Sequence, residues 1–224
     1  MRRRPKHIIW DWNGTMLNDL DVCILAVNRL LERRQLPLMT ENRYKEIFTF
    51  PIRNYYEAAG FDFSAEPFEG PAEEFIIEYK ALIQSAKLFP DVKEALKHYQ
   101  RSGIRQYVLS AMEQQALQLA LTDHEIMDYF DEVIGIADNY AVSKLERGMA
   151  LVKRHQLAKE ETVMVGDTLH DVEVATKMGL PVILIGRGHQ HIERLQKSGK
   201  PILNDLSELK DYLLNNSEKA SWVT

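Results

Sequence analysis

The chain has 224 residues, of which 45% are hydrophobic and 27% charged, and its net charge is −5. This composition is typical of a globular protein with a sizeable core, and the acidic balance without a basic stripe disfavours a nucleic-acid partner. No apolar run is long enough to span a membrane, so we expect no membrane partner. The single cysteine, Cys23, excludes an internal disulfide and favours a reducing cytoplasm.

Short runs rich in β-branched residues predict a series of strands. They span residues 7–10, 105–110, 132–136, 162–167, 181–186 and, more weakly, 201–204. Apolar residues at helical spacing lie between them, over 92–99, 149–153 and 171–178. Because strands that alternate with helices are joined by right-handed crossovers, we expect a mostly parallel sheet covered on both faces. The sequence therefore predicts a doubly wound α/β fold, Rossmann-like in its core.

One interval, from about Leu17 to about Leu88, contains no convincing strand. It holds three amphipathic stretches, over residues 24–31, 44–48 and 75–83, separated by prolines and glycine. We interpret this block as an all-helical cap domain of residues 17–87, inserted into an α/β core of residues 1–16 and 88–224. The connections near Leu17 and Phe89 would act as hinges.

Polar residues follow the predicted strands at the points where these strands end. They are Asp11, Asn13 and Thr15 after the first strand, Ser110 at the end of the second, Lys144 in the loop after the third, and Asp167 and Asp171 after the fourth. Ligands of parallel α/β sheets bind at the carboxyl ends of the strands, so we expect these side chains to converge there.

This set of residue types suits phosphoryl chemistry. Three clustered carboxylates, Asp11, Asp167 and Asp171, repel one another unless a cation lies between them, and Mg²⁺ is the usual cation where phosphate is handled. Ser110 and Lys144 can donate to phosphoryl oxygens, and a carboxylate aimed at phosphorus can form an aspartyl-phosphate. Singly, each residue is better explained as a turn, cap or solvated side chain; the prediction rests on their ordered combination.

The segments "DWNGT", "LSA", "SKLERG" and "GDTLHD" resemble the four motifs of the haloacid dehalogenase-like superfamily. The helical insert resembles its type-1 cap, and the chain is most similar to the phosphoglycolate phosphatase-like branch. The resemblance implies that Asp11 is the nucleophile. It implies that Thr15, Ser110, Ala111 and Lys144 bind the phosphoryl group. It further implies that Mg²⁺ is held by Asp11, the backbone carbonyl of Asn13 and Asp167, with Asp171 as a further ligand or an orienting group. A haloacid dehalogenase proper fits the lysine and carboxylates less well.

Asn13 departs from the pattern, because phosphatases of this superfamily typically carry a second aspartate there as general acid and base. An amide cannot exchange that proton near neutral pH, and such catalysis is worth about 10²–10⁴-fold. Four interpretations follow. The protein could be a slow phosphatase with a proton relay, for which His170 is a weak candidate, or its substrate could have a leaving group that needs no proton, such as an acyl phosphate or phosphoanhydride. It could instead be a non-catalytic phospho-ligand binder, or deamidation of Asn13-Gly14 could restore an acid at this position.

Three further features complete the prediction. Arg53, beside two tyrosines, is a candidate substrate contact in the cap, although packing of its stem on the tyrosines explains it equally well. Gly186 and Gly188 predict a turn near the rim of the site, whereas His189 and His191 lack a cysteine or acid at ligand spacing and do not predict a metal site. We expect a Mg²⁺-dependent phosphatase of a small phosphorylated metabolite, monomeric or homodimeric, or else a catalytically weak phospho-ligand-binding or regulatory protein of the same fold.

Overall fold

The computed structural model describes residues 5–136 and 144–215, and the basic run 2–4 and most of the polar tail lie outside this part. Its core is a six-stranded sheet in the order β5-β4-β1-β6-β7-β8, in which every neighbouring pair is parallel. The strands are β1 (His7–Trp10), β4 (Arg105–Glu113), β5 (Glu132–Ile136), β6 (Thr162–Gly166), β7 (Val182–Ile185) and β8 (Ile202–Leu203). The predicted fold class is confirmed.

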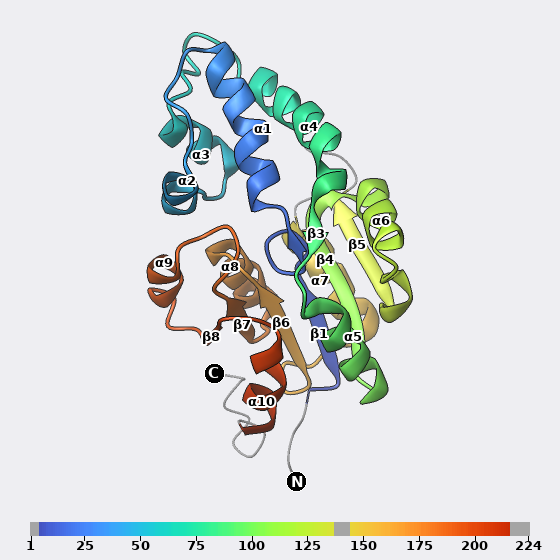
Figure 1. Ribbon diagram of the computed structural model, residues 1–224. Coiled ribbons are helices and arrows are strands. Elements are labelled where there is room, and N and C mark those ends of the chain that lie inside the picture. Colours follow the sequence, from blue (N-terminus) through green and yellow to red (C-terminus); the bar gives the residue numbers. More distant parts are fainter. Residues whose placement is uncertain (1–4, 137–143, 216–224) are drawn as a thin grey trace.

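Helices cover both faces of this sheet (Figure 1). Alternation along β1 sends Ile8 and Trp10 into one hydrophobic cluster and Ile9 into the other. The first cluster includes residues of α5 (Val92–Arg101), α6 (Gln114–Asp123) and α10 (Ser207–Asn215), and the second residues of α7 (Lys144–His155), α8 (Leu169–Met178) and α9 (Ile192–Gln196). Two short 3₁₀ helices, η1 (Ile83–Ser85) and η2 (Met127–Tyr129), lie in connections along the chain. The chain passes from β1 to β4 on one side and later returns to β6 on the other side of β1. The strand order therefore reverses at the carboxyl end of β1, and such topological switch points are where ligands of open α/β sheets usually bind.

Four helices form a separate block above the carboxyl edge of the sheet (Figure 1). They are α1 (Leu20–Arg33), α2 (Glu41–Ile47), α3 (Ile52–Ala59) and α4 (Glu69–Leu82), and residues 20–82 are called the cap below. The three amphipathic stretches correspond to α1, α2 and α4, but the sequence analysis missed α3. This helix buries the adjacent Tyr55 and Tyr56 and ends at Gly60, which adopts the left-handed conformation favoured by glycine.

The two connections between cap and core form a small antiparallel ribbon, which corrects the expectation that residues 17–88 contain no strand. Strand β2 (Leu17–Asn18) pairs with β3 (Lys87–Leu88), with Leu17 opposite Leu88. The backbone N–H of Phe89 extends the pairing by donating to the carbonyl of Met16 at 3.0 Å. The predicted hinge positions therefore lie side by side.

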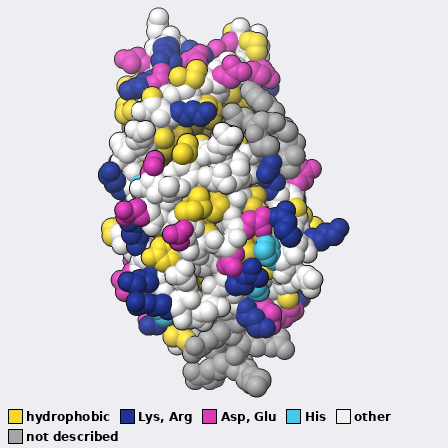
Figure 2. All heavy atoms as spheres, turned by 90° about the vertical axis from the view of Figure 1, so that its right-hand side faces the viewer, with side chains coloured by type: hydrophobic (Ala, Val, Ile, Leu, Met, Phe, Trp, Pro, Cys, Tyr) yellow, Lys and Arg dark blue, Asp and Glu magenta, His cyan; other side chains and the backbone are white. Residues whose placement is uncertain are grey.

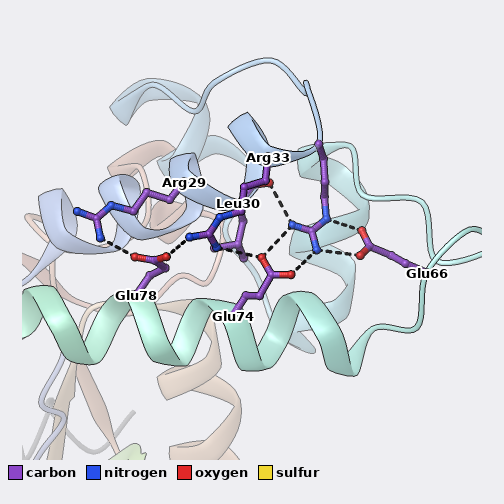
Figure 3. Close-up of polar contacts among 7 residues, drawn as sticks. Arg29, Leu30, Arg33, Glu66, Glu74 and Glu78 are labelled. Carbon is purple, nitrogen blue, oxygen red and sulfur yellow. Dashed lines mark hydrogen bonds and ion pairs between the residues drawn. The ribbon is translucent and has the colours of Figure 1, made fainter.

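Ion pairs join α1 to α4 on the cap (Figure 3). Arg29 donates to Glu78 at 2.5 Å, and Arg33 donates to both Glu78 and Glu74. Arg34, just after α1, binds Glu66 and Glu74, with a 2.8 Å distance to each from the same terminal nitrogen. These three arginines are therefore engaged with carboxylates of the cap itself.

Within the part of the chain that is described, no helix combines the length and the apolar character needed to cross a membrane. On the face shown in Figure 2, basic and acidic side chains are interspersed rather than gathered into a patch of one sign. This face therefore offers no broad basic surface of the kind that nucleic acids require.

Candidate active site

Four polar side chains from separate segments meet at the carboxyl end of β1. Asp11 follows β1, Asp167 follows β6, and Asp171 lies in the first turn of α8; all three are at most 6% exposed. Lys144 is the first residue of α7, not a loop residue as the sequence predicted, and it is also buried. Folding thus brings together the predicted nucleophile, the predicted ammonium and both fourth-motif carboxylates.

The three carboxylates each offer an oxygen to one small volume, since these atoms lie within 4.8 Å of one another. Burial, together with the neighbouring charges of Asp171 and Asp167, raises the pKa of Asp11 to about 8 even though Lys144 opposes the shift. Burial likewise raises the pKa of Asp167 to about 6. Crowding of buried carboxylates thus raises both pKa values, and a divalent cation between them would relieve the repulsion.

Lys144 lies between two of these acids. Its ammonium donates to Asp11 Oδ1 and, at 2.7 Å, to Asp171 Oδ1. Burial lowers the pKa of Lys144, but the charges of Asp11 and Asp171 outweigh it, so the pKa lies above its usual range and the group is a fixed cation. It lies between Asp11 and Asp171 and screens the two carboxylates from each other.

Asp171 is anchored by the start of its own helix. Thr168 and Asp171 form a capping box, in which the Thr168 hydroxyl oxygen accepts from the Asp171 N–H and Asp171 Oδ2 accepts from the Thr168 N–H at 3.0 Å. The Thr168 hydroxyl also donates to Asp171 Oδ2 at 2.7 Å. The backbone N–H of Asp167 donates to the same oxygen at 3.2 Å. With its other oxygen on Lys144, Asp171 is better suited to orient Lys144 and Asp167 than to bind a metal with both oxygens.

Asp167 lies in a tight cradle. A Cβ at Gly14 or Gly188 would come within 2.3 Å or 2.1 Å of Asp167 Oδ2, so only glycine fits at either position. The backbone N–H of His189 donates to that oxygen at 2.7 Å, and the Thr15 hydroxyl donates to Oδ1 at 3.1 Å. Gly188 thus forms part of the site, as the sequence indicated, whereas Gly186 packs against Ile192 and Ile202, away from it.

The predicted phosphoryl-binding residues take different positions. Ala111 and Lys144 line the cavity described below. Ser110 is buried within β4, which continues beyond it, and its hydroxyl accepts from the Met112 N–H at 3.0 Å. The Thr15 hydroxyl is directed to Asp167 and, at 3.3 Å, to Asp11.

Asn13 takes part in a buried network that the sequence analysis missed. Its Nδ2 donates to Asp19 Oδ2 at 2.8 Å and to the Tyr79 hydroxyl of the cap at 2.7 Å, and that hydroxyl in turn donates to Asp19 at 2.8 Å. Asp19 Oδ1 accepts from the Gly14 N–H at 3.0 Å. The amide of Asn13 is thus a hydrogen-bond donor to a buried carboxylate, a contact that an ionised aspartate at this position could not make.

His189 completes this network from the core. Its Nε2 lies 3.1 Å from Asp19 Oδ1, and its Nδ1 lies 3.1 Å from the hydroxyl of Tyr44 in the cap. Burial lowers the pKa of His189, but the charge of Asp19 raises it more, to about 9, so the ring is an imidazolium at neutral pH. Cys23 lies 3.5 Å from Asp19, so His189 does have an acidic and a thiol neighbour, contrary to the inference from sequence spacing.

A cavity of about 190 Å³ opens over these residues between core and cap. It is smaller than the roughly 300–1,000 Å³ of clefts for drug-sized ligands, which favours a small ligand. His170 lines it and stacks on Phe50 of the cap, with ring centroids 4.3 Å apart, so this histidine contributes a cap–core contact.

Arg53, the predicted substrate contact, is not among the described residues that line the cavity. Its guanidinium binds Glu57 at 3.1 Å and lies over the rings of Phe63 and Phe68. A role of Arg53 in substrate binding therefore stays a prediction that this arrangement does not favour.

Comparison with known proteins agrees with this geometry. The family model of haloacid dehalogenase-like hydrolases matches residues 8–185. A phosphoglycolate phosphatase of Nitrosococcus oceani is 23% identical over 222 residues, covering 95% of this chain and 98% of its own. The tyrosine-protein kinase PtkA of Mycobacterium tuberculosis is also 23% identical, covering 93% of this chain and 72% of its own. The structure of the haloacid dehalogenase-like protein SP0104 from Streptococcus pneumoniae has a TM-score of 0.81 at 21% identity, covering 93% of this chain and 98% of its own. The chain belongs to the haloacid dehalogenase-like hydrolases and, within them, resembles the phosphoglycolate phosphatases.

Proposed function

We propose that this protein is a Mg²⁺-dependent phosphatase of a small phosphorylated metabolite, working through an aspartyl-phosphate on Asp11. One observation carries the proposal: a buried carboxylate at the end of the central strand is paired with Lys144 and lies within 4.8 Å of two further carboxylates. An aspartate that served only as a turn or cap residue at the end of a strand would not be expected to lie beside a buried lysine and two further carboxylates. The single cysteine makes the cytoplasm the expected compartment.

The donor set fits Mg²⁺. Hard oxygen ligands are available from Asp11 and Asp167, the raised pKa values of both carboxyls are relieved by a cation, and Asp171 would orient them. The backbone carbonyl of Asn13 is the remaining candidate ligand. When bound, Mg²⁺ would neutralise charge on the carboxylates and on the transferring phosphoryl oxygens.

The chain's own residues would divide the reaction between them. An oxygen of Asp11 forms a bond to phosphorus while the bond to the leaving oxygen breaks, and its electron pair departs with that oxygen. Lys144 holds phosphoryl charge beside Asp11. Water then attacks the phosphorus of the aspartyl-phosphate, which releases phosphate and restores Asp11. Asn13 can neither protonate the leaving oxygen nor take a proton from that water.

Asn13 also supports a second candidate, a phospho-ligand-binding or regulatory protein with little or no turnover. Its amide is fixed by Asp19 and Tyr79, so the position is structurally stable without a carboxylate.

Release of phosphate from a generic aryl phosphate, measured with Mg²⁺ and with EDTA, separates the two candidates. A phosphatase gives release that EDTA abolishes and that Asp11→Asn eliminates. A binding protein gives no release in any of these samples but binds inorganic phosphate in calorimetry with Mg²⁺.

A further inference from the structure

The cap side of the cavity is almost entirely aromatic. Rings from α2, α3, α4 and the segment between α2 and α3 line it, Tyr44, Phe48, Phe50, Tyr55, Phe75 and Tyr79 among them. These rings pack on one another: Tyr44 stacks on Phe48 with centroids 5.0 Å apart, and Phe48 meets Tyr55 edge-to-face at 5.4 Å. Such a wall favours a flat aromatic group by offset and edge-to-face contacts.

Positive charge is missing from the same wall. Among the described residues that line the cavity, the cap supplies no lysine, arginine or histidine. The arginines of the cap are engaged elsewhere: Arg43 donates to the carbonyls of Ala58 and Ala59, Arg53 binds Glu57, and Arg29 and Arg33 bind the carboxylates of α4 (Figure 3). The cations on the core side, Lys144 and His189, are already paired with Asp11, Asp171 and Asp19. A leaving group with its own carboxylate, as in phosphoglycolate, would therefore lose its hydration there without gaining an unpaired counter-charge.

The chemistry at Asn13 selects the same class of leaving group independently. No acid at this position can protonate the departing oxygen, so a good leaving group must be stable as an anion. A phenol has a pKa of about 10, compared with about 15.7 for water, and alkoxides resemble hydroxide in this respect. Phenolate can therefore leave without a proton, whereas an alkoxide needs one.

Tyr55 adds a polar feature to the aromatic wall. It lines the cavity, is 2% exposed, and its hydroxyl has no hydrogen-bond partner among the described residues. A buried hydroxyl without a partner is costly, so a ligand that carries a polar substituent on its ring could satisfy it.

We infer that the substrates are small aryl phosphate monoesters, with the ring held by the aromatic wall of the cap. The inference rests on the proposed phosphatase function and names its leaving group. In the first step the bond between phosphorus and the aryl oxygen breaks, its electron pair leaves with phenolate, and the bond from Asp11 to phosphorus forms. Water then regenerates Asp11, and phenolate takes its proton from solvent.

A matched panel of phosphates tests this directly, with kcat/KM measured in Mg²⁺. Phenyl phosphate is compared with cyclohexyl phosphate, which has a similar size but an alkoxide leaving group, with phosphoglycolate, and with acetyl phosphate, which leaves easily but has no ring. We expect phenyl phosphate to exceed cyclohexyl phosphate and phosphoglycolate by at least 100-fold, and acetyl phosphate by at least tenfold. Equal or higher values for phosphoglycolate or acetyl phosphate would overturn the inference while leaving the phosphatase function intact.

Binding of phosphonates separates recognition from turnover. Phenylphosphonate should bind the Mg²⁺-loaded protein at least tenfold more tightly than phosphonoacetate in calorimetry. If no phosphate ester is hydrolysed but this preference holds, the proposed phosphatase function fails and the aromatic ligand class stands. If phosphonoacetate binds equally well or better, the ligand class fails.

Two cap variants test whether the aromatic wall recognises the ring of the substrate. Phe75→Leu removes a ring from the cavity wall, and Phe63→Leu removes a cap ring that does not line the cavity. We expect Phe75→Leu to raise KM for phenyl phosphate at least fivefold and leave KM for acetyl phosphate within twofold, with Phe63→Leu changing neither. A parallel loss on both substrates in Phe75→Leu would show that the ring serves cap structure rather than ligand recognition.

Discussion

Replacing Asn13 by aspartate should restore the missing proton donor. The new carboxyl would be partly buried beside Asp19, whose charge would raise its pKa, and a raised pKa suits a general acid that works near neutral pH. We expect kcat for an alkyl phosphate such as ethyl phosphate to rise by about 10²–10⁴-fold, the usual worth of general acid–base catalysis. Phenyl phosphate should gain less than about tenfold, because its leaving group needs little protonation.

The same substitution should lower stability. It removes two hydrogen bonds from the Asn13 amide, at 2.8 Å to Asp19 and 2.7 Å to Tyr79, and sets an acid against the Asp19 carboxylate. Loss of a hydrogen bond to a charged group costs about 1.5–3 kcal/mol and loss of a neutral one about 1 kcal/mol. We therefore expect unfolding to be easier by about 3 kcal/mol, which lowers Tm by roughly 6–12 °C for a chain of this size.

Two variants control this experiment. Asn13→Ala removes the amide without adding a carboxyl and should not raise kcat on either ester. The double variant Asn13→Asp with Asp19→Asn restores an amide donor opposite the new acid and should recover part of the lost Tm. If Asn13→Asp remains folded and binds Mg²⁺ but hydrolyses ethyl phosphate no faster than the natural protein, position 13 does not limit proton transfer and the reasoning fails.

Four further predictions concern the metal site and the cap. Asp11→Asn should eliminate phosphate release in Mg²⁺, with Tm within a few degrees of the parent; release at the parent rate would show that the nucleophile is misassigned. Mg²⁺ affinity should increase from pH 6 to pH 8 and then level off, because the raised pKa values of Asp11, about 8, and Asp167, about 6, mean that Mg²⁺ must displace protons at lower pH; calorimetry that finds a flat profile contradicts this. In the metal-free protein the same two shifts make stability fall as pH rises from about 4 to about 8, and Mg²⁺ should reverse the fall. Arg34→Lys cannot bind Glu66 and Glu74 in two-pronged fashion and should lower the free energy of unfolding by about 1 kcal/mol in urea titration, less at high salt.

The core strands were predictable because each is a short buried run bounded by polar or small residues, and burial on both faces of a parallel sheet requires that pattern. The same rule located Asp11 and Asp167 at strand ends. It failed for Ser110, because β4 continues three residues beyond it with an irregular register against β5, and for Lys144, which begins a helix.

The missed parts depend on contacts that sequence spacing does not encode. Asp19 and His189 are 170 residues apart and meet only because the loop after β7 folds over the start of the cap. Helix α3 has only eight residues, and its adjacent tyrosines were interpreted as flanking a substrate-binding arginine. The sequence carries one signal for Asp19, its acidic side chain six residues after Asn13.

The pairing of β2 with β3 restricts how the active site can be reached. Two separate linkers would let the cap twist and tilt freely, but strands that are hydrogen-bonded to each other must bend together, about one common axis. If the cap opens about that axis, Tyr44 must separate from His189 and Phe50 from His170, so under the proposed function each turnover would break these contacts. The rate of cap opening, and with it the release of phosphate by the proposed phosphatase, would then depend on a few contacts far from the ribbon. Solvent viscosity should slow turnover wherever that release limits the rate.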